Sequence, residues 1–301
     1  MDSDYTTQKL IDRVGVKAMT SASSGLSPQQ ILDLANDALR TYLVPFTARL
    51  REEWWVGKTD FVLTTDSNGM VTVPNTVAQS LRTVSWNNAG VLVPLTRIEP
   101  ENSFGYQPSS TVPMGFQLRG NTLQVLPKSS GIEVHVSAMV RPPLMVLTEN
   151  AGLITTAAGA ALTLDAVPLS WQAATPSSVD LVSSDSPFAT QGTFGVSSLV
   201  GSLLTLSSNP GATAGWYVSD VGTSPFASIP VEFYGLLEQQ VVVMLHAANG
   251  DKRLKAAQEL KKELEEAARV IGAPRTQGNS RPIVNPSAPG MRAMQALWPK
   301  R

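Results

Sequence analysis

The sequence predicts an α+β fold, in which a helical framework carries β-hairpins and an inserted all-β module. Helical periodicity marks the N-terminal part and returns before the C-terminus, whereas two-residue alternation fills the middle. Residues 151–228 also differ sharply in composition from the rest. We therefore divide the chain into an N-terminal arm (1–26), a core (27–150 and 229–272), an inserted β-rich module (151–228) and an extended C-terminal arm (273–301).

The N-terminal part begins with a polar segment, in which a short helix is expected around Gln8–Val14. A longer helix should begin at Ser27, which is a good N-cap and is followed by proline at the first helical position. Gln30 completes a capping box with Ser27. Pro45 is expected to kink or break this helix, because proline lacks the N–H that the helical ladder needs.

From about residue 60 the apolar period changes to two, which is typical of strands. The turn sequence Asp66–Gly69 predicts a hairpin between the strands that flank it, and Gly120-Asn121 predicts a second, tight hairpin. Arg141-Pro142-Pro143 should end the run, since proline cannot continue a ladder. The further strand candidates are QSLRTVSW, VLVPLTRI, GFQLRG, NTLQVLP and IEVHVSAMV.

The segment 151–228 contains no lysine or arginine and only four acids. Short β-patterned pieces separated by Gly, Pro and Asn predict a sandwich or barrel-like module. Gly159–Leu164 (GAALTL) echoes Gly201–Leu206 (GSLLTL). We interpret this echo as coincidence, because two six-residue matches in such biased sequence are weak evidence of a repeat.

Two helices should close the core and pack against the N-terminal helix. The first, around Tyr234–Ala248, has such a broad apolar face that we expect burial on most sides. The second, 251–271, is amphipathic and should end at Gly272, before Pro274. Its predicted apolar stripe consists of Leu254, Ala257, Leu260, Leu264, Ala267, Ala268 and Ile271.

Composition excludes several classes of site. The chain has no cysteine, so disulfides, thiolate metal sites and cysteine nucleophiles are excluded. No apolar run approaches the ~20 residues needed to span a bilayer, and we expect no membrane partner. Charged residues are only 16% of the chain and the net charge is −1, so a global basic field for nucleic acid is absent.

Motifs for catalysis or cofactor binding are also lacking, so we predict no enzyme, no cofactor and no metal. His135 fits a strand side chain and His246 a helix C-terminus, and neither has a nearby carboxylate or second histidine at metal spacing. No nucleophile elbow and no phosphate-binding glycine loop occurs. Glu52-Glu53 beside Trp54-Trp55 could suggest a sugar site, but a solvated helix side with anchoring tryptophans explains them better.

The C-terminal arm is the remaining candidate for function. Residues 273–301 contain five prolines and five basic residues but no acid. An ordinary unstructured terminus is one reading. Its large apolar residues favour an arm that folds on a partner surface. The predicted contact residues are Arg275, Arg281, Ile283, Arg292, Met294, Leu297 and Trp298.

The chain combines a SPQQILDLANDAL helix, β-hairpins that end in RPP, and a closing helical pair from IPVEFYGLLEQQ to KKELEEAARV. An APRTQGNSRPIV segment then leads to a loose C-terminus. This layout resembles the head-to-tail adaptor (connector) proteins of tailed bacteriophages, especially the short-tailed type. The resemblance covers roughly 27–147 and 226–285, whereas 151–228 would be an addition to the common pattern.

The resemblance implies a structural virion protein in the neck between head and tail, assembled in the host cytoplasm. Such adaptors form a homo-oligomeric ring, commonly a dodecamer, under the portal protein. The ring extends the channel through which double-stranded DNA passes without sequence-specific binding, and it is a platform for nozzle or tail-tube proteins. The C-terminal arm would dock on the portal.

Two other interpretations stay open. One is a β-rich tail-fibre, carbohydrate-binding or depolymerase component, for which the six tryptophans leave room. That reading predicts a clustered carboxylate pair with aromatic rings in a groove. The other is a tail-tube or capsid-decorating protein, which is also structural.

Overall fold

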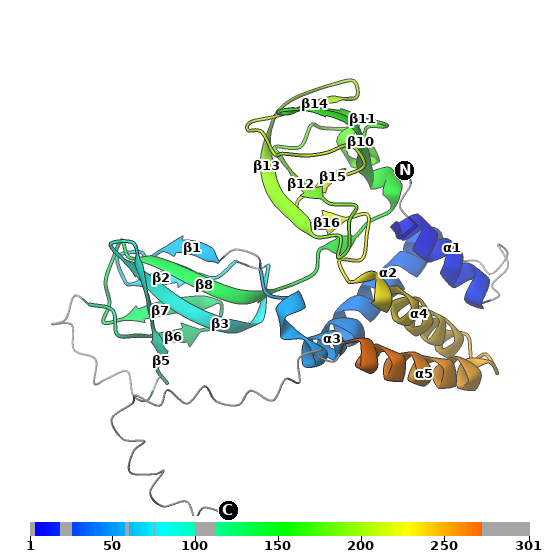
Figure 1. Ribbon diagram of the computed structural model, residues 1–301, viewed down its shortest axis with the longest axis horizontal. Coiled ribbons are helices and arrows are strands. Elements are labelled where there is room, and N and C mark those ends of the chain that lie inside the picture. The colour runs from blue at the N-terminus through cyan, green and yellow to red at the C-terminus, as the bar shows by residue number, and fades with distance from the viewer. Residues whose placement is uncertain are drawn as a thin grey trace, which may run out of the picture.

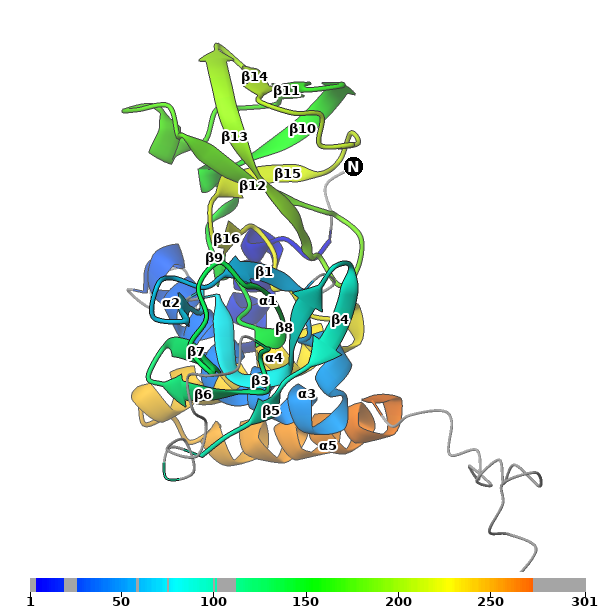
Figure 2. The ribbon, with the colours of Figure 1, turned by 90° about the vertical axis from the view of Figure 1, so that its left-hand side faces the viewer.

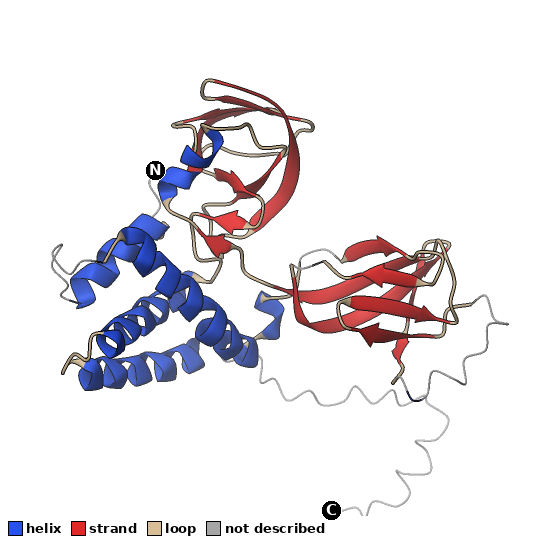
Figure 3. Cartoon of the chain, turned by 180° about the vertical axis from the view of Figure 1, so that it is seen from behind, coloured by secondary structure: helices blue, strands red, loops and turns tan. Residues whose placement is uncertain are grey.

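The computed structural model describes residues 4–18, 26–57, 60–74, 76–99, 101 and 112–272. It confirms the α+β class, with a helical part, a β-sandwich and a closed β-barrel (Figure 1). Figure 3, coloured by secondary structure, shows the helical part in blue and the strands of the two β units in red. Figure 2 shows the barrel at one end of the molecule and α5 at the opposite end.

The helical part joins segments from both ends of the sequence into one hydrophobic cluster. The predicted packing of the N-terminal helix with the closing pair is therefore confirmed. The capping box also forms, since the Ser27 hydroxyl accepts from the Gln30 N–H and the Gln30 side chain accepts from the Ser27 N–H. The helices are α1 (Thr7–Ala18), α2 (Pro28–Ala38), α3 (Val44–Leu50), α4 (Tyr234–Ala248) and α5 (Leu254–Gly272), with 3₁₀ turns η2 (Glu52–Trp54) and η6 (Val231–Phe233).

Pro45 neither breaks nor ends its helix. A π-helical turn, η1 (Leu39–Leu43), lies between α2 and α3, and the Val44 N–H bonds to the Leu39 carbonyl. The wider π turn gives the proline ring room near the preceding carbonyls, which a regular α-helix would not. Trp55 and Trp54 then pack into the helical cluster, as predicted for anchoring side chains.

The segment expected as an N-terminal arm needs correction for residues 4–18. The short helix is confirmed, but α1 buries Leu10, Ile11, Val14 and Ala18 in the core of the helical part. The Thr7 N–H also bonds to the Pro225 carbonyl, more than two hundred residues away. The polar sequence suggested an arm because the apolar positions of α1 are few, but they all lie on one face.

The closing helices agree with expectation in part. α4 buries most of its length, as predicted. In α5 the predicted stripe is only partly internal, since Ala257 and Ala268 are buried whereas Leu260, Ala267 and Ile271 are exposed. The buried face is rotated relative to the predicted stripe, and it includes Gly272.

The sandwich comprises two four-stranded sheets, ordered β1-β8-β3-β4 and β2-β7-β6-β5. Its core includes Val71, Val84, Leu123, Val134 and Val136. β8 ends before Arg141-Pro142-Pro143, as predicted. The strands are β1 (Phe61–Thr64), β2 (Met70–Thr72), β3 (Val77–Asn88), β4 (Val91–Pro94), β5 (Thr96–Arg97), β6 (Gly115–Arg119), β7 (Thr122–Leu126) and β8 (Glu133–Val140).

One of the two predicted hairpins forms. β6 and β7 pair across Gly120-Asn121, with Arg119 opposite Thr122. The hairpin predicted around Asp66–Gly69 is wrong. The turn itself exists, since the Asp66 carboxylate accepts from two backbone N–H groups, but β1 pairs with β8 and β2 with β7. This turn joins the two sheets, because each flanking strand finds a longer partner elsewhere.

The inserted module is a closed barrel in the order β10-β11-β14-β13-β12-β15, which confirms the barrel-like prediction. It encloses a separate hydrophobic cluster that includes Ile154, Leu162, Leu181, Leu204 and Val218. The strands are β10 (Ala151–Ala158), β11 (Ala161–Leu164), β12 (Ser178–Val182), β13 (Thr190–Val200), β14 (Leu203–Leu206) and β15 (Tyr217–Asp220), with 3₁₀ turns η4 (Thr148–Asn150) and η5 (Leu169–Trp171).

The echo between GAALTL and GSLLTL corresponds to equivalent positions in the barrel, so our reading as coincidence needs correction. Each segment follows a long strand, turns at a glycine with positive φ, and forms a four-residue strand. β11 and β14 pair with Leu162 opposite Leu204. The β10–β11 and β13–β14 ladders also carry register shifts at matching places. The barrel thus has an approximate internal two-fold arrangement.

A short parallel pair connects the barrel to the helices. β9 (Leu144–Met145) pairs with β16 (Thr223–Ser224). Asn36 of α2 donates from Nδ2 to the Met145 carbonyl at 3.0 Å and accepts from the Met145 N–H at 2.8 Å. This buried amide therefore fixes α2 against the base of the barrel.

Candidate functional site

The predicted partner-binding residues lie outside the described residues, because all of them fall within 273–301. What the described residues define is the place from which that segment departs. α5 ends at Gly272, which is buried beside α3. A Cβ added to Gly272 would lie 2.9 Å from the Leu50 Cδ1 atom, so glycine permits the close approach of the two helix ends. The arm therefore starts at the corner between α3 and α5.

A polar cluster ties α5 to the π turn near this corner. The Tyr42 hydroxyl donates to Glu265 Oε1, and Lys261 Nζ lies 3.8 Å from the centre of the Tyr42 ring. Lys261 also pairs with Glu265 at 3.4 Å. Burial, and then the hydrogen bond to Glu265, raise the pKa of the Tyr42 hydroxyl well above its usual range. This phenol remains a donor at physiological pH and holds α5 in place.

Two large apolar side chains of α5, Val270 and Ile271, are exposed next to the departure point of the arm. The exposed Leu260 lies about three helical turns earlier. Exposed large apolar side chains are common individually, but their presence beside the start of the arm makes this end of α5 a candidate for contact with another molecule.

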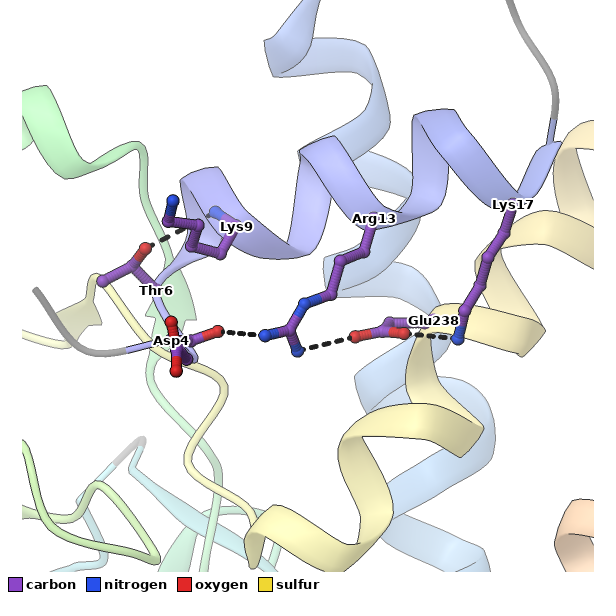
Figure 4. A network of polar contacts seen from close by, with 6 residues as sticks. All are labelled: Asp4, Thr6, Lys9, Arg13, Lys17 and Glu238. Carbon is purple, nitrogen blue, oxygen red and sulfur yellow. Dashed lines mark hydrogen bonds and ion pairs between the residues drawn. The ribbon is translucent and has the colours of Figure 1, made fainter.

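The N-terminal helix is held by a buried carboxylate (Figure 4). Glu238 of α4 is 4% exposed and accepts from Arg13 Nη1 at 3.3 Å and from Lys17 Nζ. Arg13 Nη2 also donates to the Asp4 carbonyl at 2.7 Å. Sequence reasoning missed this network, since its partners are 221 and 225 residues apart. A glutamate inside the apolar pattern of α4 was the only available signal.

Each histidine contacts a carboxylate, contrary to our expectation from the sequence. Glu133 Oε1 lies 2.8 Å from His135 Nε2 and accepts from Asn87 Nδ2 at 2.6 Å. The hydrogen bond from Asn87, and then that with His135, hold the pKa of the Glu133 carboxyl below its usual range. Residues at i and i+2 of a strand share a face, which is the signal that we overlooked.

The second histidine is paired just beyond the end of α4. His246 Nδ1 lies 3.2 Å from Asp251 Oδ2. The pKa of the Asp251 carboxyl is lowered, first because the Arg253 backbone N–H donates to it. Both contacts close the loop between α4 and α5, so they have a structural explanation. Within the described ranges, no group of three or more His, Cys, Asp or Glu side chains is placed to hold a metal ion.

The acids of the barrel mostly serve its own turns. Asp180 is buried and accepts from the Thr193 hydroxyl and from a backbone N–H of the β15–β16 turn. Asp220 Oδ1 accepts from Trp171 Nε1 at 2.6 Å, and Asp165 accepts from two backbone N–H groups. Because this module contains no basic side chain, it offers no cation for a phosphate.

A groove between α1 and the barrel is the place to look for a sugar site. Its lining includes Asp12, Glu149 and Asp165, together with Tyr217. Tyr217 is only 4% exposed, and its ring makes a T-shaped contact with Phe226 at 5.2 Å between centroids, so burial leaves no open ring face for a ligand. The clustered carboxylate pair with stacking aromatic rings is therefore incomplete here.

None of the described helices is both long enough and apolar enough to cross a membrane. Neither the models of known protein families nor the curated proteins compared with the sequence match it.

Proposed function

We propose that this chain is a head-to-tail adaptor of a short-tailed bacteriophage, which forms a ring under the portal. The observation that carries the proposal is the basic, proline-rich segment with apolar anchors that follows directly on α5. The arm would dock on the portal through Arg275, Arg281, Ile283, Arg292, Met294, Leu297 and Trp298. Arginine and tryptophan are the residue types that most often dominate binding energy at interfaces.

The arrangement of the described part supports this role. The helical cluster forms a compact base, from which the sandwich and the barrel extend as two separate β units (Figure 1). The ring would extend the DNA channel and present these units to tail proteins. The barrel lacks basic residues, so it would let DNA pass, or face outward, without binding phosphates.

The carbohydrate-binding alternative has weaker support. The groove beside α1 has carboxylates, but Tyr217 is turned into the core and Asp165 is engaged by backbone N–H groups. Binding of oligosaccharides by the isolated chain, measured by calorimetry, would favour this alternative over the adaptor.

The test is to mix the purified chain with its portal protein and to measure mass by light scattering and shape by electron microscopy. We expect a ring attached to the portal. If the chain stays monomeric and does not bind the portal protein at micromolar concentrations, the proposal is wrong.

A truncated chain that ends at Gly272 should fold normally but lose attachment. A second, full-length variant keeps the arm's length and charge and replaces only Leu297 and Trp298 by serine. Because these side chains are the proposed apolar anchors, this variant should also bind the portal weakly. Full attachment of the truncated chain would refute the role of the arm.

A further inference from the structure

The sandwich has four edge strands in the described part of the chain, two in each sheet. In the sheet β1-β8-β3-β4 they are β1 and β4, which have no outer neighbour. The barrel is closed and has no edge. In the other sheet of the sandwich, β2 is only three residues long, and β5 carries Arg97, which pairs with Glu99. Edge strands that are short or charged resist pairing with other chains. The edge strands that lack such protection are therefore β1 and β4.

Both of these edges are apolar and exposed. β1 reads FVLT and β4 reads VLVP, without a charged residue. Val62 is 57% exposed on β1, and Val91 and Leu92 are 64% and 48% exposed on β4. Three of the five exposed large apolar side chains described in the sandwich region thus lie on the two opposite edges of a single sheet, and the other two, Val112 and Met114, precede β6.

The two exposed side chains Val62 and Leu92 point to the same face. Val62 is opposite His135, and Leu92 is opposite Asn87. The face that includes Val134 and Val136 fills the sandwich core, so the alternating positions on these strands lie on the outer face. If the two edges met, Val62 and Leu92 would lie on one side of a continuous sheet.

The backbone of each edge is also oriented for pairing. The Thr65 N–H bonds to the Ile132 carbonyl, and the Leu95 N–H bonds to the Val84 carbonyl. Because antiparallel ladders alternate, Val62 and Thr64 direct their N–H and C=O groups away from the sheet, and so does Leu92. Pro94 also lies at an outward position, where its missing N–H is tolerated at an edge. Pairing along β4 would therefore end at Pro94.

We propose that β1 of one copy pairs antiparallel with β4 of the next copy, and that this contact joins the subunits of the ring. The inference rests on the proposed function for the ring itself. Three successive antiparallel pairs separate β1 from β4, so the two strands run in opposite directions within a copy. A neighbour related by rotation can thus extend the sheet. Contact between two different surfaces is head-to-tail, which generates a closed ring when the rotation closes.

Cysteine trapping tests the contact directly, because the natural chain has no cysteine. The double variant Val62→Cys/Leu92→Cys, mixed with portal and mildly oxidised, should give a ladder of disulfide-linked multimers. An equal mixture of the two single variants should stop at dimers, because each copy then has one reactive edge. Absence of cross-links in assembled rings would overturn the proposal.

Charge substitution gives a second, independent readout. Val62→Lys or Leu92→Lys should weaken association between subunits about tenfold or more, since each change removes apolar contact and introduces a charge. Val200→Lys, at an exposed barrel position outside both edges, is the matched control and should assemble normally. Circular dichroism should show that all three variants fold, because the altered side chains are exposed.

The outcomes separate this inference from the proposed function. If the wild-type chain forms rings and both edge variants form them equally well, the edge contact is wrong and the adaptor role stands. If the wild-type chain forms no oligomer even with portal, both fail.

Discussion

The ion-pair network around Glu238 predicts an unequal response to removing its anion or its cations. Glu238 is nearly inaccessible, whereas the side chains of Arg13 and Lys17 are each 40% exposed. Replacing both cations by alanine leaves a buried carboxylate without compensation. Removing the partners of a buried charge typically destabilises a protein by about 3–5 kcal/mol. We expect Arg13→Ala/Lys17→Ala to fall near the lower end, because water can reach the outer side of this network.

Removing the anion should be milder. Glu238→Gln keeps the shape and an acceptor oxygen, and the two cations can turn toward water. The loss should be about 1–2 kcal/mol, which is the difference between charge-assisted and neutral hydrogen bonds summed over two contacts. The triple variant should recover part of the stability lost by the double variant, because it no longer buries a charge.

The assay is urea unfolding followed by tryptophan fluorescence, with amide hydrogen exchange of α1 to localise the effect. Exchange in Thr7–Ala18 should rise more in the double alanine variant than in Glu238→Gln. If the glutamine variant is the less stable one, Glu238 is not a desolvated anion and the reasoning fails. If exchange rises equally in all helices, the network does not act through α1.

Two further predictions concern close packing and acid stability. Gly115→Ala should destabilise the sandwich by about 1–3 kcal/mol, because the new Cβ would lie 2.6 Å from the Thr96 carbonyl oxygen, whereas Gly15→Ala on open α1 should be neutral or stabilising in the same urea titration. The lowered pKa of Asp251 means that its contribution is present above its unfolded pKa of about 4 and is lost as the pH falls through the folded value. Asp251→Asn should therefore destabilise the chain at neutral pH but not at low pH, as unfolding midpoints between about pH 2 and pH 7 would show; an equal difference at both ends would contradict the linkage.

Much of the local structure could be predicted because it depends on neighbouring residues. The capping box at Ser27 and the tight turn at Gly120-Asn121 each involve groups within four residues of one another. The end of β8 before Pro142-Pro143 is likewise a property of proline itself. The absence of basic residues from the barrel is a fact of composition, and it leaves this module without a cationic side chain for a phosphate.

The residues of the candidate site could be predicted less well from the sequence. The α5 stripe was predicted from periodicity, but periodicity does not say which flank of an apolar face meets the core, and Leu260 and Ile271 proved to be exposed. The carboxylate partner of His246 depends on closure of the loop after α4, whereas that of His135 lies two residues away on the same strand and was overlooked. The arm residues, from Arg275 to Trp298, remain predictions from sequence.

The sequence by itself determined where helices start, where strands end, which module is uncharged, and that a basic apolar arm follows α5. Only the tertiary structure decided that β1 and β2 enter different sheets, that Glu238 faces Arg13 and Lys17, and that two echoing segments take equivalent places in a barrel. The physical reason is the number of possible partners. A local hydrogen bond has one available partner close in sequence. A strand edge or a buried charge has many possible partners far away in sequence, and the packing of the whole chain determines which of them it contacts.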